Sequence, residues 1–167
     1  ARPLARTREY VEIVRRLAGD EWTLPLPGGL GRPLKLLARP VQERIPIYLG
    51  AVGPKAIEQA GAIADGWLPF MLAPDQLELL SRGAKSAGRA LEDIDVAEVL
   101  PLAVADDVAA ARDQVRPWLA FYLGAMGARE KNFYVEAAGR YGHGDCAATV
   151  QERWLAGDRA GAAAALT

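Results

Sequence analysis

The sequence predicts an α/β fold in which parallel strands are joined by crossover helices. Two observations support this prediction. Short apolar runs rich in β-favouring residues alternate with longer segments whose apolar residues recur at helical spacing. The predicted order is helix, strand, helix, strand, helix, strand and then several helices, and strands that alternate with helices in this way pair in parallel. The 167 residues are enough for one domain with an apolar core.

The first half of the chain contains the clearest helices and strands. Residues 7–18 carry one apolar stripe and predict a helix, whereas the many prolines and glycines of residues 23–34 predict an irregular loop. Residues 47–51 predict a short buried strand. A helix follows over 54–64, with Pro54 at its first position, where a missing N–H costs nothing.

The same pattern then repeats. Residues 67–70 predict a second strand, and a helix follows from Pro74 to near Gly88. Residues 96–105 predict a third strand, although Pro101 interrupts its hydrogen-bond ladder.

The rest of the chain is predicted to be helical. Asp107 is a favourable N-cap for a helix over 108–123, which Pro117 should kink or divide. The chain then continues with short helices separated by glycines, over 132–138, 147–155 and 159–166.

Composition excludes several classes of function. The net charge is -1 with acids and bases interspersed, so no nucleic-acid surface is expected. No apolar run is long enough to span a membrane, and the N-terminus does not resemble a secretory signal. Cys146 is the single cysteine, which leaves no intrachain disulfide and favours a cytoplasmic location. His143 is the single histidine, and no cluster has metal-ligand spacing, so no metal is expected.

The strongest chemical feature is the turn between the first strand and its helix. Gly50 and Gly53 would let a ligand approach the backbone closely, and the helix that starts at Pro54 presents free N–H groups and a partial positive charge. Lys55 could add a full charge. From the residues alone, this turn is either a phosphate site or a plain connection. Its Gly-x-x-Gly spacing is neither a Rossmann fingerprint nor a P-loop.

Aromatic residues supply a second group of candidates. Trp67 and Phe70 end a predicted strand, where α/β enzymes place their sites, and Tyr134 lies in the region after the third strand. Core packing and a place in a pocket wall are both open for these three residues.

Two blocks of the sequence resemble a known family. Residues 46–55 with 60–69, and residues 120–129 with 132–134, are similar to the luciferase-like monooxygenase superfamily, above all to its coenzyme F420-dependent oxidoreductases. The resemblance implies a (β/α)8 barrel. It also implies that the loop formed by Gly50, Ala51, Val52, Gly53, Pro54 and Lys55 binds the phosphate of coenzyme F420 or, alternatively, FMN.

The resemblance further implies an enzyme that passes a hydride between the (deaza)flavin and a small organic substrate, or uses reduced flavin with oxygen. Trp67, Phe70, Arg129 and Tyr134 are then expected near the substrate. The catalytic residues are not identified, because the groups that contact the reactive ring are expected outside these residues.

The chain also departs from the family pattern. A barrel of this type needs about 250 residues, so residues 1–167 are expected to be a single partial domain, about the C-terminal half of the barrel. Pro69, Phe70, Met71 and Leu72 stand where members that use sugar phosphates carry a lysine, which favours an apolar substrate.

Two alternatives to this function stay open. One is a non-catalytic half-barrel, a binding or structural module that forms a homodimer to cover its sheet edges. The other is a different barrel enzyme that shares only the loop geometry.

Overall fold

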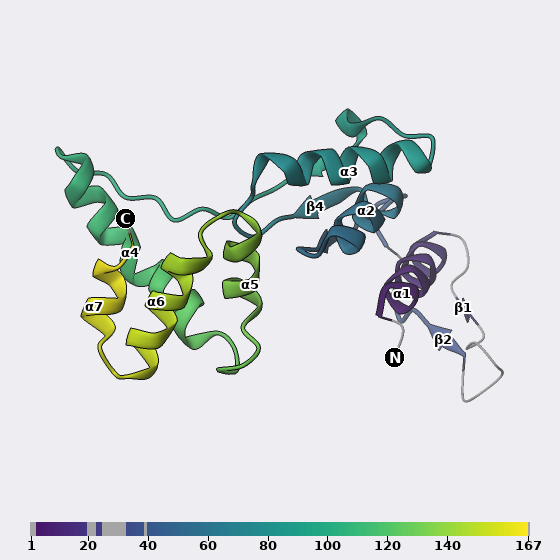
Figure 1. Ribbon diagram of the computed structural model, residues 1–167. Helices are drawn as coiled ribbons and strands as arrows, with labels where there is room; N and C mark the ends of the chain where they lie inside the picture. Colours follow the sequence, from purple (N-terminus) through teal and green to yellow (C-terminus); the bar gives the residue numbers. More distant parts are fainter. Residues whose placement is uncertain (1–2, 20–22, 25–32, 39, 167) are drawn as a thin grey trace. The chain divides into compact units, whose positions relative to one another are not determined.

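The computed structural model describes residues 3–19, 23–24, 33–38 and 40–166 (Figure 1). The chain forms two compact units, Ala1–Val99 (the first unit) and Leu100–Thr167 (the second unit).

The first unit contains the strands. Along the chain its elements are α1 (Pro3–Ala18), β1 (Thr23–Leu24), β2 (Leu34–Lys35), β3 (Tyr48–Gly50), α2 (Pro54–Ile63), β4 (Gly66–Leu68), α3 (Pro74–Ser86), the 3₁₀ turn η2 (Leu91–Asp93) and β5 (Asp95–Val96).

The sheet of the first unit has the order β3-β4-β5, and both strand pairs are parallel. The predicted parallel sheet with crossover helices is therefore confirmed. Leu49 lies opposite Trp67, which lies opposite Val96, and these three side chains belong to the core shared with α2 and α3. Because side chains alternate along a strand, Tyr48 and Leu68 point to the other face, where both are exposed.

Helices α2 and α3 pack against each other through glycines (Figure 1). A Cβ added to Gly61 would lie 2.2 Å from the Leu80 carbonyl oxygen, and one added to Gly83 would lie 1.9 Å from the Glu58 carbonyl oxygen. The two backbones therefore approach more closely than any larger residue allows. The fully buried side chains beneath this contact include Ile57, Ala60, Trp67, Leu80 and Ala84.

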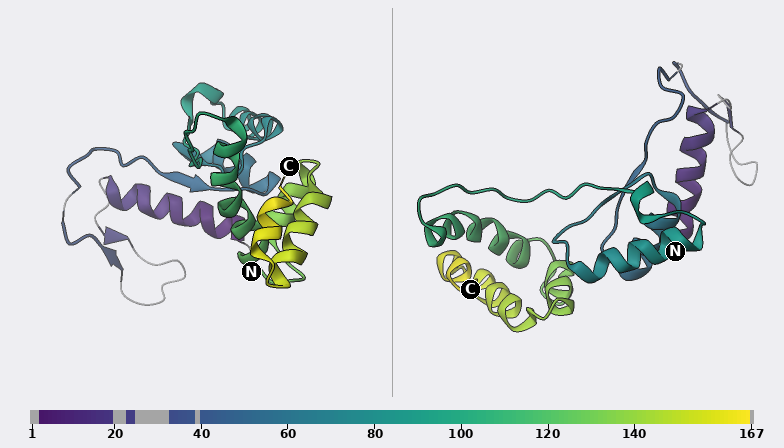
Figure 2. Two further views of the ribbon diagram at one scale, coloured as in Figure 1. Left: turned by 90° about the vertical axis from the view of Figure 1, so that its left-hand side faces the viewer. Right: turned by 90° about the horizontal axis from the view of Figure 1, so that it is seen from above.

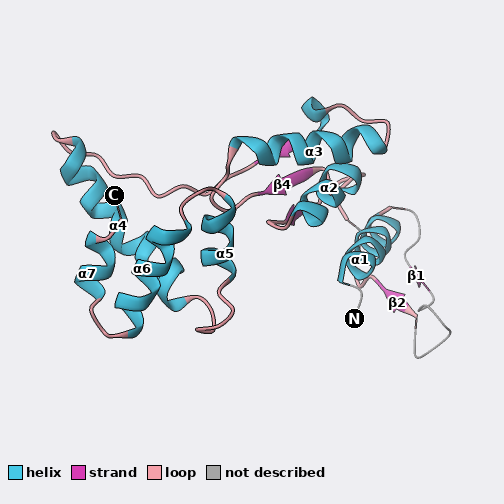
Figure 3. Ribbon diagram, in the orientation of Figure 1, coloured by secondary structure: helices cyan, strands magenta, loops and turns pink. Residues whose placement is uncertain are grey.

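The second unit is helical throughout its regular elements (Figure 3). Its helices are α4 (Val108–Ala125), α5 (Phe133–Arg140), α6 (Gly144–Leu155) and α7 (Arg159–Ala164). Figure 2 shows them gathered side by side in both views, around a core that includes Ala120, Leu123, Val150 and Ala162. Buried Asn132 joins two of the helices, because its side chain caps α5 and donates to the Leu123 carbonyl at 2.7 Å.

Two predictions of secondary structure are corrected, and for a third one of its two alternatives is excluded. The third strand, predicted over 96–105, is limited to Asp95–Val96, and residues 97–107 have no regular structure. Helix α4 continues through Pro117, so this residue does not divide the helix, and the kink stays a prediction. Part of the predicted irregular loop 23–34 forms strand, since β1 and β2 pair in antiparallel fashion; residues 25–32 of that loop lie outside the described residues.

The predicted third strand fails because a strand needs a hydrogen-bonded neighbour. The Ala97 amide still donates to the Trp67 carbonyl of β4 at 3.0 Å, but the described residues after Ala97 belong to no strand pair. The apolar side chains there are exposed: Val99 by 79%, Leu102 by 89% and Val104 by 83%. Across the described ranges, no helix combines the length and the apolar character that crossing a membrane requires.

Candidate cofactor-binding site

The loops that follow β3, β4 and β5 lie at one edge of the sheet. All three strands are parallel, so their carboxyl ends point the same way and residues 51–53, 69–73 and 97–99 become neighbours. In α/β folds this edge is where ligands bind.

The loop after β3 has the geometry of a helix start. Gly53 is the N-cap of α2, in extended conformation with φ -77° and ψ 145°, and Pro54 begins the helix. The Gly53 carbonyl accepts hydrogen bonds from the amides of Ala56 and Ile57, at 2.9 and 3.0 Å. Among the described residues, the amides of Val52, Gly53 and Lys55 have no such protein partner, so they are available to an anion.

Neither glycine of this loop is required by the fold itself. A Cβ added to Gly50 or to Gly53 would meet no atom within 4 Å, and neither residue has a positive φ. This distinguishes them from Gly61 and Gly83, which the helix contact demands, and from Gly88, whose φ is +70°. The space in front of the loop is therefore open to a ligand that approaches the backbone.

Lys55 also borders a pocket beside α1. It lies on the face of α2 that meets α1, where it lines a pocket of about 420 Å³ together with Arg8 and Glu58. A contribution of the Lys55 ammonium group to ligand binding stays a prediction.

Trp67 supports the loop from behind. Its side chain is fully buried in the core, and its indole N–H donates to the Ala51 carbonyl at 2.8 Å. Of the two interpretations that the sequence left open for Trp67, the structure places the side chain in the core. An influence of Trp67 on a ligand would therefore be indirect.

The loop after β4 is tied to the loop after β5. The Leu72 amide donates to Glu98 Oε1 at 2.7 Å, and Met71, one residue earlier, has a φ of 54° that non-glycine residues rarely adopt. Phe70 is half-buried in this loop. Sequence reasoning missed Glu98, because residue 98 falls inside the strand predicted over 96–105.

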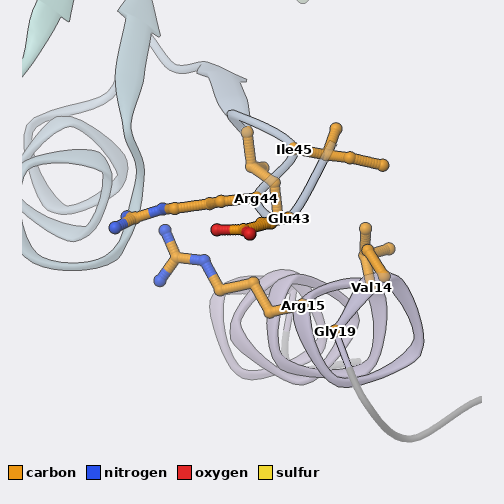
Figure 4. A pocket seen from close by; sticks show the side chains of 8 residues that line it. Val14, Arg15, Gly19, Glu43, Arg44 and Ile45 are labelled. Carbon is orange, nitrogen blue, oxygen red and sulfur yellow. The ribbon is translucent and has the colours of Figure 1, made fainter. Parts of the chain in front are cut away.

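The opposite, amino-terminal edge of the sheet carries a charged cluster around Asp65. Asp65 Oδ2 accepts from the Ile47 amide at 2.8 Å and from Arg15 Nη2 at 3.1 Å, and Oδ1 pairs with Arg44. Arg15 and Arg44 also line a pocket of about 390 Å³ with Glu43, and Figure 4 shows their guanidinium groups side by side. Burial alone would raise the pKa of Asp65, but the Ile47 amide and the two arginines outweigh it and hold the pKa below its ordinary value.

A second polar pair lies on the uncovered face of the sheet. The Tyr48 hydroxyl donates to Asp95 Oδ2 at 2.5 Å, and this hydrogen bond to a carboxylate, with a smaller contribution from burial, raises the pKa of Tyr48. The Tyr48 ring covers Gly66, where an added Cβ would lie 2.2 Å from the ring. Within the described part of the chain, no three His, Cys, Asp or Glu side chains gather as metal ligands would.

Arg129 and Tyr134 belong to the second unit. Arg129 is exposed in the turn between α4 and α5. Tyr134 is half-buried, with its ring 5.2 Å from that of Tyr122 and 5.3 Å from that of Phe133. A place for these two residues beside a substrate stays a prediction.

Comparison with known proteins assigns the family. The model of the luciferase-like monooxygenases matches residues 1–167, and the chain belongs to that family. The resemblance seen in the sequence is thereby confirmed.

Individual relatives point to the F420-dependent branch. A Mycobacterium tuberculosis protein, whose name assigns it provisionally to the coenzyme F420-dependent oxidoreductases, is 40% identical over 161 residues, which are 85% of this chain and 46% of the relative. The 5,10-methylenetetrahydromethanopterin reductase of Methanolobus tindarius is 32% identical over 129 residues, covering 72% of this chain and 38% of the relative.

A solved structure confirms the fold. The coenzyme F420-dependent tetrahydromethanopterin reductase from Methanopyrus kandleri matches with a TM-score of 0.75 and 27% identity, over 99% of this chain and 48% of that one. The chain therefore has the α/β fold of these barrel enzymes and spans about half the length of the relatives it matches.

Proposed function

We propose that this chain forms the phosphate-binding part of an oxidoreductase that uses coenzyme F420, with FMN as the alternative. The bound cofactor would supply hydride transfer to or from a small organic substrate. The observation that supports this most directly is the open space beside Gly50 and Gly53, where an added Cβ would meet no atom within 4 Å. The family and its F420-dependent relatives make a cofactor phosphate the natural occupant.

Each part of the loop has a distinct task in this proposal. The amides of Val52, Gly53 and Lys55 would donate to phosphate oxygens, and the positive end of the α2 dipole would add to their attraction. Gly50 and Gly53 would let the phosphate reach those amides, while Pro54 sets the direction of the helix.

The substrate that we propose is apolar. Leu68 is 42% exposed at the end of β4, and Phe70, Met71 and Leu72 follow it in the loop tied to Glu98. Apolar side chains at this position would exclude water from the reacting centre, whereas a charged sugar phosphate would find no basic partner in this loop.

Cofactor titration of the Gly53 variants tests the assignment of the loop. Gly53→Ala should weaken the binding of F420 or FMN several-fold and Gly53→Asp should abolish it, because the new atoms occupy the phosphate's place. The melting temperature should not fall in Gly53→Ala, since its Cβ meets no neighbour. Binding is followed by the fluorescence of the cofactor.

Gly139→Ala is the matched control. Gly139 lies in α5 of the second unit, where a Cβ would make only an ordinary contact at 4.0 Å, so cofactor affinity should be unchanged. Failure of the wild-type protein to bind either cofactor would refute the proposed function. Equal affinity in wild type and Gly53→Asp would remove the loop from the site.

A second candidate function is a non-catalytic half-barrel that pairs with another copy of itself. The observation that favours it is the segment 99–104 after β5, where Val99, Leu100, Leu102 and Val104 are exposed and no strand pairing is present among the described residues. A dimer in sedimentation velocity that binds neither F420 nor FMN would support this function over the first.

A further inference from the structure

The buried hydrogen bond between Trp67 and Ala51 fixes the orientation of one peptide unit in the loop. Trp67 is fully buried and Ala51 is 7% exposed, so water does not compete for this bond. The indole N–H is the donor, at 2.8 Å from the Ala51 carbonyl oxygen. The Ala51 carbonyl is thereby turned toward the core and away from the open side of the loop.

The geometry of the peptide bond carries this orientation to the next residue. A trans peptide is planar, and its C=O and N–H point in opposite directions. Since the Ala51 carbonyl points inward to Trp67, the Val52 N–H points outward. It therefore faces the side on which Gly53 leaves open space at the start of α2.

We propose that Trp67 is a positioning residue for phosphate binding, which acts by holding the Val52 amide outward. This inference rests on the proposed function of the loop. Without the indole N–H, the Ala51 carbonyl would be a buried acceptor with no donor, and turning it outward to water would turn the Val52 amide inward. The effect of Trp67 is therefore specific to ligands that carry the phosphate.

An isosteric replacement tests this role. Trp67 replaced by 3-benzothienylalanine keeps the shape of the ring and exchanges only the N–H for sulfur. We expect the affinity for F420 and FMN to fall about tenfold, the loss of one hydrogen bond to a charged group. The affinity for riboflavin, and for the deazaflavin core without its phosphate tail, should be unchanged. Trp67→Phe should show the same selectivity.

The same replacement at Trp154 is the control. Trp154 lies in α6 of the second unit and packs against Phe121, so the affinity for both classes of ligand should stay at the wild-type value. Near-ultraviolet circular dichroism verifies that each variant is folded.

The outcomes separate this inference from the function on which it rests. A loss confined to phosphate-bearing ligands supports it. Unchanged affinity for all ligands overturns it, and so does an equal loss for phosphate-bearing and phosphate-free ligands, which would reveal a purely structural tryptophan. If the wild-type protein binds none of the ligands, the proposed function itself is refuted.

Discussion

Asp65 joins three parts of the first unit that are distant in sequence. Its carboxylate pairs with Arg15 of α1 and with Arg44 of the segment before β3, and it accepts a hydrogen bond from the Ile47 amide. Asp65 itself directly precedes β4. The carboxylate is largely shielded from water, so losing its charge would leave both arginines without their partner. Barrel residues at this edge serve stability, whereas those at the opposite edge serve function.

The lowered pKa of Asp65 makes part of the stability dependent on pH. The carboxylate form is favoured in the folded state, so its contribution is complete above the unfolded pKa of about 3.9. It is lost as the pH falls through the lower folded pKa. Urea unfolding between pH 2 and pH 7 should show Asp65→Asn less stable than wild type at pH 7, with the difference shrinking toward pH 2.

An exposed carboxylate provides the comparison for this experiment. Asp106→Asn, outside the cluster, should follow the wild-type curve at each pH. A difference between Asp65→Asn and wild type that stayed constant down to pH 2 would contradict a role for the Asp65 charge.

For single residues, the sequence predicted those whose role depends on adjacent residues in the chain. Gly50, Gly53 and Pro54 could be predicted because adjacent residues make the turn and the helix start. The hydrogen-bond partners of Asp65 and Trp67 could not be predicted, because they are distant in sequence. Arg15 lies 50 residues from Asp65, and Ala51 lies 16 residues from Trp67.

Among the secondary-structure elements, the contact between α2 and α3 is the most demanding. Gly61 and Gly83 allow the two backbones to touch, and each side chain larger than hydrogen would push the helices apart. We expect Gly83→Ala to lower the free energy of unfolding by about 1–3 kcal/mol, the usual cost of overpacking. Chemical denaturation of the variant measures this directly.

The Gly139→Ala variant again serves as the reference. It should leave stability unchanged or raise it by up to about 1 kcal/mol, because alanine is the better helix former. A Gly83→Ala protein as stable as wild type would show that α3 can move away from α2 without loss.

The helices and the strands β3 and β4 were predictable because their patterns are local. The apolar stripes predicted the bounds of α2 and α3 to within a few residues, and glycines indicated where the short helices end. Strand 96–105 had the composition of a strand, but its formation depends on a neighbour that composition does not report.

The whole molecule exposes an apolar segment that ordinary monomers would bury. Leu102 and Val104 are 89% and 83% exposed, and exposed apolar side chains that lie close in sequence favour association. The double variant Leu102→Lys with Val104→Lys should therefore reduce self-association in sedimentation velocity. Its free energy of unfolding should change by less than about 0.5 kcal/mol, as for other exposed positions.

Leu80→Ala supplies the contrasting case at a buried position. It should cost about 2–5 kcal/mol, because Leu80 is fully buried between α2 and the sheet. If the lysine variant lost comparable stability, residues 102 and 104 would have to be buried in the protein in solution.

The support that Trp67 gives to the loop has a consequence for the thermodynamics of ligand capture. A loop that must become ordered on binding loses conformational entropy, and this loss weakens affinity. Here the Ala51 carbonyl is held before any ligand arrives, and α2 is clamped against α3. The loop is thus preorganised, so binding of a phosphate would cost little conformational entropy. Most of the favourable free energy of its hydrogen bonds would then contribute to affinity.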